Sequence, residues 1–146
     1  MAMKVTLFVS LMVAALAIPI SGVQALGYDI LIYGTVYCPS SSSIGANGIN
    51  KRPIFPNAEI HVMCGGQVAS SAYTNGNGKF LFSMDHQRYT VPIILKICNL
   101  VVISPLSRCP KPTLGHLESS LNYVGDTISG DLKISSIIPV GFHIVP

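Results

Sequence analysis

Short segments in which apolar and polar residues alternate recur along the chain, and this period of two indicates β-strands. The clearest is segment 58–64, where one face is formed by Ala58, Ile60, Val62 and Cys64. The opposite face is formed by Glu59, His61 and Met63. Segment 79–84 repeats the pattern, with one face formed by Phe80, Phe82 and Met84. Both segments are predicted to be half-buried strands, and the first directs Cys64 inward.

Other apolar segments predict further strands. Segment 30–37 is β-branched and aromatic, as expected of a strand buried on much of both faces, and 67–73 is a weaker candidate. Segment 93–104 is long and rich in Ile and Val, which favours a central strand bent near Asn99. Short strands are predicted at 121–124, 131–138 and 142–145. Segment 116–123 has a second interpretation as one or two helical turns, because Leu117 and Leu121 are four residues apart.

Gly, Pro and Asn separate these segments. The sequence TNGNG at 74–78 is a strong signal for a hairpin turn, because Asn and Gly tolerate positive φ. Segments 38–57, 85–92 and 106–116 are predicted to be loops or connections. The chain is therefore predicted to be all-β, a single-domain antiparallel β-sandwich or partly closed barrel of about seven strands.

Composition narrows the function classes. The chain has 146 residues, of which 10% are charged and 49% hydrophobic, so it is not intrinsically disordered. The net charge is only +3, and no basic cluster exceeds the pair Lys51–Arg52, which argues against nucleic-acid binding. So few charges allow two interpretations. Either apolar patches are exposed and favour adsorption to surfaces, or Ser, Thr, Asn and Gly cover the outside.

The N-terminus has the pattern of a secretory signal peptide. Lys4 precedes an apolar run over 5–18, Pro19 breaks it, and Val23 and Ala25 are the small residues at the −3 and −1 positions. The run is shorter than the roughly 20 residues that span a bilayer, although a retained anchor is the alternative. We predict a signal peptide over 1–25 and a secreted, extracellular domain over 26–146, without a transmembrane anchor.

The four cysteines all lie in the predicted secreted domain, at Cys38, Cys64, Cys98 and Cys109. An even number in an oxidising compartment predicts two disulfides, and three pairings are open. Zinc is the alternative, but no C-x-x-C pair is present.

Recognisable catalytic machinery is missing from the sequence. The four histidines are scattered, no G-x-S-x-G or phosphate-binding motif occurs, and the nearest carboxylates, Asp126 and Asp131, have the surroundings of turn residues. We therefore expect no catalytic residue, cofactor or metal, and no enzyme. Tyr33 and Tyr37 share one strand face, which favours sugar binding if they are exposed and belongs to the core if they are not.

Five blocks together resemble a known family. They are GTVYC at 34–38, FPNAEIHVMC at 55–64, TNGNGKF at 74–80, the run from Cys98 to Cys109, and IPVGFH at 138–143. The sequence resembles the pollen olive-allergen and extensin family of plants, and within it the phylloplanins, over essentially the whole of 26–146. It lacks one family cysteine shortly after Cys38, where serines stand, and a late partner.

The resemblance implies a transthyretin-like or carboxypeptidase-regulatory-like sandwich, with the bridges Cys38–Cys109 and Cys64–Cys98. It also implies a secreted defence protein of the leaf or aerial surface that inhibits germination or growth of oomycete and fungal spores without catalysis. Its expected partner is a microbial spore or membrane surface. The alternative is a wall-matrix or polysaccharide-binding module in growth or development. A hydrolase is the third and weakest hypothesis.

Overall fold

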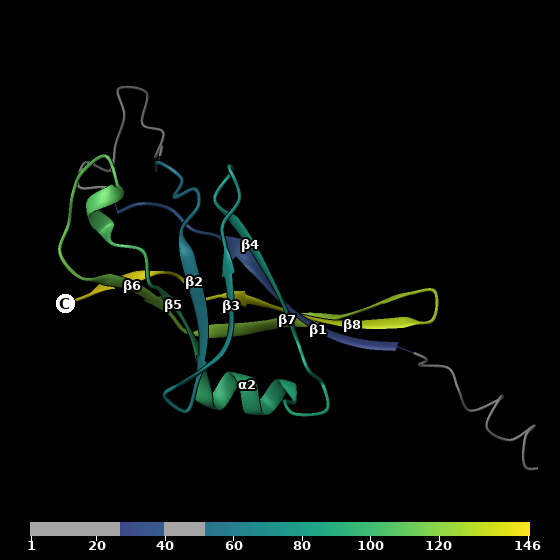
Figure 1. The fold of residues 1–146 in the computed structure, drawn as a ribbon. Helices are drawn as coiled ribbons and strands as arrows, with labels where there is room; N and C mark the ends of the chain where they lie inside the picture. Colours follow the sequence, from purple (N-terminus) through teal and green to yellow (C-terminus); the bar gives the residue numbers. More distant parts are fainter. Residues whose placement is uncertain (1–26, 40–51) are drawn as a thin grey trace, which may run out of the picture.

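The computed structural model describes residues 27–39 and 52–146, in which two β-sheets pack face to face (Figure 1). The strand order is β4-β1-β8-β7 in the four-stranded sheet and β3-β2-β5-β6-β9 in the five-stranded sheet. The elements are β1 (Gly27–Thr35), β2 (Glu59–Cys64), β3 (Gln67–Tyr73), β4 (Lys79–Met84), α2 (Val91–Ile97), β5 (Cys98–Val102), the 3₁₀ turn η1 (Leu106–Arg108), β6 (His116–Ser119), β7 (Leu121–Ser129), β8 (Leu132–Pro139) and β9 (His143–Val145). The predicted all-β sandwich is confirmed, and the two sheets do not close into a barrel.

The core lies between the sheets and is built from alternate strand positions, as the sequence pattern predicts. β2 buries Ile60, Val62 and Cys64, and β4 buries Phe80, Phe82 and Met84. Neighbouring strands of both sheets add Ile30, Ile32, Leu100, Val102 and Ile137. Burying one such side chain contributes about 1.5–3 kcal/mol, so this core is the main source of stability.

One pairing departs from the antiparallel prediction. β1 is antiparallel to β4 but parallel to β8, with Gly27 opposite Leu132 and Ile32 opposite Ile137. The first strand of the described chain is therefore enclosed by strands from distant parts of the sequence. A parallel pair gives no local turn signal, because its strands need a long connection.

The predicted central strand over 93–104 is wrong in its first part. Residues 91–97 form α2, and β5 begins only at Cys98. Thr90 caps the helix, since its hydroxyl accepts the Ile93 N–H at 3.4 Å, and Pro92 fits the first turn because it needs no donor there. The Ile-rich composition favoured a strand. The Thr90 cap, Pro92 in the first turn and the packing of Ile94 into the core stabilise a helix instead. Segment 116–123 is strand rather than helix, in β6 and β7.

The turn at 74–78 forms but does not make the predicted hairpin, because β3 and β4 belong to different sheets. Thr74 is buried at the crossing. Its hydroxyl accepts the Ala58 N–H at 2.8 Å and donates to the Phe55 carbonyl at 2.6 Å. Asn75 Oδ1 accepts two backbone N–H groups, from Asn77 and Lys79. The turn thus carries the chain from one sheet to the other, whereas the β2–β3 hairpin turns through Gly65 and Gly66, both at positive φ.

Two disulfides lie inside the described residues. Cys38 is joined to Cys109, and Cys64 to Cys98, which is its direct neighbour across β2 and β5. This is the pairing that the family resemblance implies. The predicted signal peptide over 1–25 and the serine run at 40–43 lie outside the described residues. Within 27–39 and 52–146, no helix is long and apolar enough to cross a membrane.

Candidate functional site

The outer face of the five-stranded sheet gathers polar side chains that are far apart in the sequence. Strand register places His61 beside Val101, Val101 beside Glu118, and Glu118 beside His143. His116 lies two residues before Glu118 on the same face. Three of the four histidines, which are scattered in the sequence, thus lie on this one face. Sequence reasoning missed this because the order of the strands is set by the fold and not by spacing.

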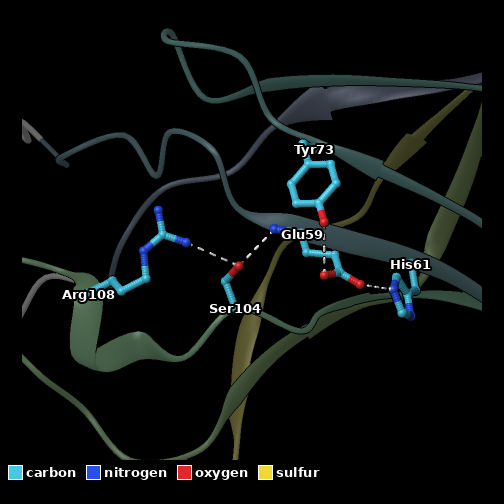
Figure 2. Close-up of polar contacts among 5 residues, drawn as sticks. All are labelled: Glu59, His61, Tyr73, Ser104 and Arg108. Atoms are coloured by element: carbon cyan, nitrogen blue, oxygen red, sulfur yellow. Dashed lines mark hydrogen bonds and ion pairs between the residues drawn. The ribbon is translucent and has the colours of Figure 1, made fainter.

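Two of these histidines each contact a glutamate of their own strand. His61 Nε2 lies 2.6 Å from Glu59 Oε2, and His116 Nε2 lies 2.9 Å from Glu118 Oε1. The Tyr73 hydroxyl donates to Glu59 Oε1 at 3.3 Å, as Figure 2 shows. In the described part of the chain, no three His, Cys, Asp or Glu side chains are placed to hold a metal ion. Ser71 stands opposite His61 in the register of β2 and β3.

Beside this face, Arg108 joins the segment 104–108 to the loop before β2, and Figure 2 shows its contact with Ser104. Its guanidinium donates to the carbonyls of Pro56 and Asn57 and to the Ser104 hydroxyl, and it lies 5.4 Å from the Phe55 ring centroid. The Ser104 hydroxyl in turn accepts the Glu59 N–H at 2.8 Å. Because its partners are backbone carbonyls and one buried serine, Arg108 fixes the loop before β2.

A second polar cluster surrounds Asp126 on the four-stranded sheet. The Ser135 hydroxyl donates to Asp126 Oδ1 at 2.6 Å, and the Tyr123 hydroxyl donates to the same atom at 2.5 Å. Lys133 Nζ lies 3.4 Å from Asp126 Oδ2. The Ser135 oxygen is also 2.8 Å from the Tyr28 hydroxyl. Since Ser135 gives its proton to Asp126, Tyr28 is the donor in that contact, and the chain of hydrogen bonds crosses β1, β8 and β7.

These contacts shift two ionisations. The hydrogen bonds from Ser135 and Tyr123, aided by the charge of Lys133, hold the pKa of Asp126 below its usual range. The same hydrogen bond to Asp126 raises the pKa of Tyr123 to about 12. Asp126 is therefore a strand residue with three polar partners, Tyr123, Lys133 and Ser135, and its interpretation as a turn residue is wrong. Asp131 does lie in the turn between β7 and β8.

Two adjoining recesses at one end of the sandwich contain Tyr33 and Tyr37. The larger, about 480 Å³, is lined by Tyr37, Arg52, Leu117, Phe142 and His143. The smaller, about 430 Å³, is lined by Tyr33, Lys79, Phe80 and Ile138. Both include Thr35 and Pro139, so they meet along the end of β1. Tyr33 and Tyr37 are 39% and 42% exposed, so they are not core residues. We call these two recesses the tyrosine groove.

The described residues thus define a class of protein, a disulfide-bonded β-sandwich with an open aromatic groove and polar clusters that are satisfied within their own sheets. Comparison with known proteins places it further. The family model described as phylloplanin antifungal protein matches residues 26–146. A phylloplanin from Nicotiana tabacum is 36% identical over 118 residues, covering 76% of this chain and 73% of the relative. The chain belongs to the phylloplanin family.

Proposed function

We propose that this chain is a secreted plant defence protein of the leaf or aerial surface, or of the apoplast, that inhibits germination or growth of oomycete and fungal spores without catalysis. The observation that carries the proposal is the match to an antifungal family over residues 26–146. This span begins where the predicted signal peptide of residues 1–25 ends. N-terminal sequencing of the protein from plant tissue should find Leu26 first, and a chain that retains residues 1–25 would contradict secretion by cleavage.

The polar clusters support a non-catalytic action. Glu59, Glu118 and Asp126 are each engaged by side chains of their own sheet, and the described residues that line the tyrosine groove include no Asp or Glu. Glycoside hydrolysis requires two such carboxyl groups on either side of the scissile bond. Turnover of generic glycoside or ester substrates by the purified protein would overturn this part of the proposal.

Spore germination is the direct test. The oxidised protein should inhibit oomycete and fungal spores in proportion to dose, and a reduced and alkylated sample should not. Inhibition by both samples would show that the fold is not needed. No inhibition by a sample that melts cooperatively would reject the defence function.

A second function, binding of wall polysaccharide, is favoured by the exposure of Tyr33 and Tyr37 in the tyrosine groove. Aromatic rings in an open groove offer flat apolar surfaces against which sugar rings can pack, with polar groups nearby to fix orientation. Retention on immobilised wall polysaccharide should fall for Tyr33→Ala and Tyr37→Ala. Tyr73→Ala is the matched control, because Tyr73 is exposed on the other sheet. Equal retention of all three variants would remove the groove from this function.

We also propose that the phylloplanins belong with the pollen olive-allergen and extensin family, with its transthyretin-like sandwich. The support is structural as well as sequential. The motif TNGNGKF at 74–80 supplies the sheet-crossing turn, the Thr74 hydroxyl and buried Phe80, so the residues shared with that family are the ones that hold the two sheets together. A six-cysteine member of that family should show the same crossing turn and the equivalents of both bridges.

A further inference from the structure

Helix α2 has a composition that burial does not explain. Of its seven residues only Ile94 is buried, while Ile93, Leu95 and Ile97 are 43%, 37% and 45% exposed. A surface helix normally shows apolar residues on one stripe and polar residues on the other side. Here the solvent-facing side is apolar as well. We call Ile93, Leu95 and Ile97 the α2 apolar face.

The α2 apolar face lies at one extremity of the sandwich. Figure 1 shows α2 at the lower end of the molecule, next to the ends of β2, β3 and β5. The helix is fixed there at its C-terminal end, where the Ile97 carbonyl accepts the Gly65 N–H at 3.0 Å and Cys98 is bound to Cys64. Ile94 holds its other side against the core. The exposed side chains are thus carried on a short, well-anchored and protruding element.

The charged residues that flank this face in the sequence are mostly cationic. Lys96 belongs to the helix itself and has no ion-pair partner among the described residues, and Arg88 lies just before it, over the Tyr89 ring at 5.9 Å. Asp85 is the nearest acidic residue in the sequence, and it is occupied in closing the preceding turn, where Oδ1 accepts the Gln87 N–H at 2.9 Å. From residue 86 to residue 117 the sequence contains no Asp or Glu. The sequence that flanks the face therefore carries cations and no carboxylate, and this charge suits an anionic surface.

We propose that the α2 apolar face is a membrane-contact site that inserts into the interface of an anionic phospholipid bilayer, with Lys96 and Arg88 at the headgroups. Apolar side chains flanked by cations are the arrangement by which interfacial helices bind such bilayers. A second copy of this chain fits less well. Three partly exposed side chains fall far short of the about 800 Å² per partner that a stable dimer buries. A fluid bilayer, in contrast, can surround a small protrusion.

This inference rests on the proposed function and names the surface that would meet the spore. Its test uses the absence of tryptophan from the sequence. Ile97→Trp places a single fluorescent reporter on the α2 apolar face, and Leu81→Trp places one on the outer face of the four-stranded sheet, where Leu81 is also exposed. With vesicles of phosphatidylcholine and phosphatidylglycerol, Trp emission of the first variant should shift to the blue and be quenched by brominated lipid. The second should not change.

Affinity for these vesicles then separates the apolar contribution of the isoleucines from the electrostatic contribution of Lys96. Ile93→Ser and Ile97→Ser should each weaken binding about tenfold, because a buried aliphatic side chain is worth at least that factor. Lys96→Gln should weaken it about fivefold on anionic vesicles and have little effect on pure phosphatidylcholine. Leu81→Ser is the matched control and should bind as the wild-type protein does. Ile94 is left intact in all variants, so the core beneath the helix is preserved.

Other results would overturn the proposal. These are an unchanged emission of Ile97→Trp on anionic vesicles, equal shifts in both tryptophan variants, or a concentration-dependent dimer that Ile97→Ser abolishes. The spore assay keeps the two hypotheses apart. If wild-type protein inhibits spores without binding vesicles, the membrane site fails and the defence function stands. If it binds vesicles through α2 without inhibiting spores, the defence function fails and the membrane site stands.

Discussion

The sheet-crossing turn makes the buried Thr74 hydroxyl a sensitive point of the fold. Its oxygen accepts the Ala58 N–H and its proton is donated to the Phe55 carbonyl, both in residues that are fully or almost fully buried. Thr74→Val keeps the shape of the side chain and removes both hydrogen bonds. Water does not reach the two backbone groups, so each is left without a partner.

The magnitude follows from those two groups. Leaving one buried donor or acceptor without a hydrogen bond costs about 1–3 kcal/mol, so the loss of two should lower the free energy of unfolding of Thr74→Val by about 2–6 kcal/mol. For a domain of this size the melting temperature should fall by roughly 3–5 °C for each kcal/mol. The backbone hydrogen bonds of Thr74, from its N–H to the Ala58 carbonyl and from the Asn57 N–H to its carbonyl, remain in place and do not compensate.

Urea unfolding of the oxidised protein, followed by circular dichroism, measures the change. The control is Thr74→Ser, which keeps the hydroxyl and removes one buried methyl group, for a loss of about 1 kcal/mol. The reasoning is refuted if the two variants lose the same amount, or if Thr74→Val loses less than Thr74→Ser. Either result would show that the hydroxyl does not hold the crossing.

Three further predictions concern the turn, the Asp126 cluster and the bridges. Gly78→Ala should lower the free energy of unfolding by at least about 1–2 kcal/mol, since Gly78 has φ +75° and an added Cβ would lie 2.8 Å from the Val36 oxygen. Gly76 has open space around it, so Gly76→Ala should be neutral in the same urea assay. At pH values below about 4 the melting temperature should fall, because Asp126 is protonated in the unfolded chain before it is in the folded one. It should fall again as the pH rises from about 10 to 12, because Tyr123 ionises more easily in the unfolded chain. Asp126→Asn should weaken both of these pH dependences. Reduction of both disulfides should abolish cooperative melting, because each bridge contributes about 4 kcal/mol on the chain-entropy model; a cooperative transition after alkylation would contradict this.

Strand positions could be predicted where the alternation was clean. Segments 58–64 and 79–84 have one apolar face each, and the structure buries those faces. The helix at 91–97 could not be predicted from periodicity, because its exposed face is as apolar as its buried one. The same exposed isoleucines that obscured the helix are the observation on which the membrane-contact proposal depends.

Tertiary neighbours were beyond the reach of sequence spacing. Asp126 is joined to Tyr28 through Ser135, across three strands, and His143 meets Glu118 only because β9 pairs with β6. The TNGNG segment was correctly identified as a turn, but a turn signal carries no information on whether the two flanking strands pair with each other. The exposure of Tyr33 and Tyr37 likewise needed the arrangement of the sheets.

The nested order of the disulfides has a consequence for how the chain matures. The Cys64–Cys98 bridge lies entirely within the span closed by Cys38 and Cys109. The chain is synthesised from its N-terminus, so Cys64 is the first cysteine available to Cys38 and its native partner, Cys109, is the last. β1 is likewise complete long before β8 exists to pair with it. A fold with so many distant contacts forms slowly, and an early wrong bridge is corrected only by thiol–disulfide exchange. On the secretory route that we propose, production of the folded protein should depend on a disulfide isomerase, and in its absence the Cys38–Cys64 isomer should accumulate.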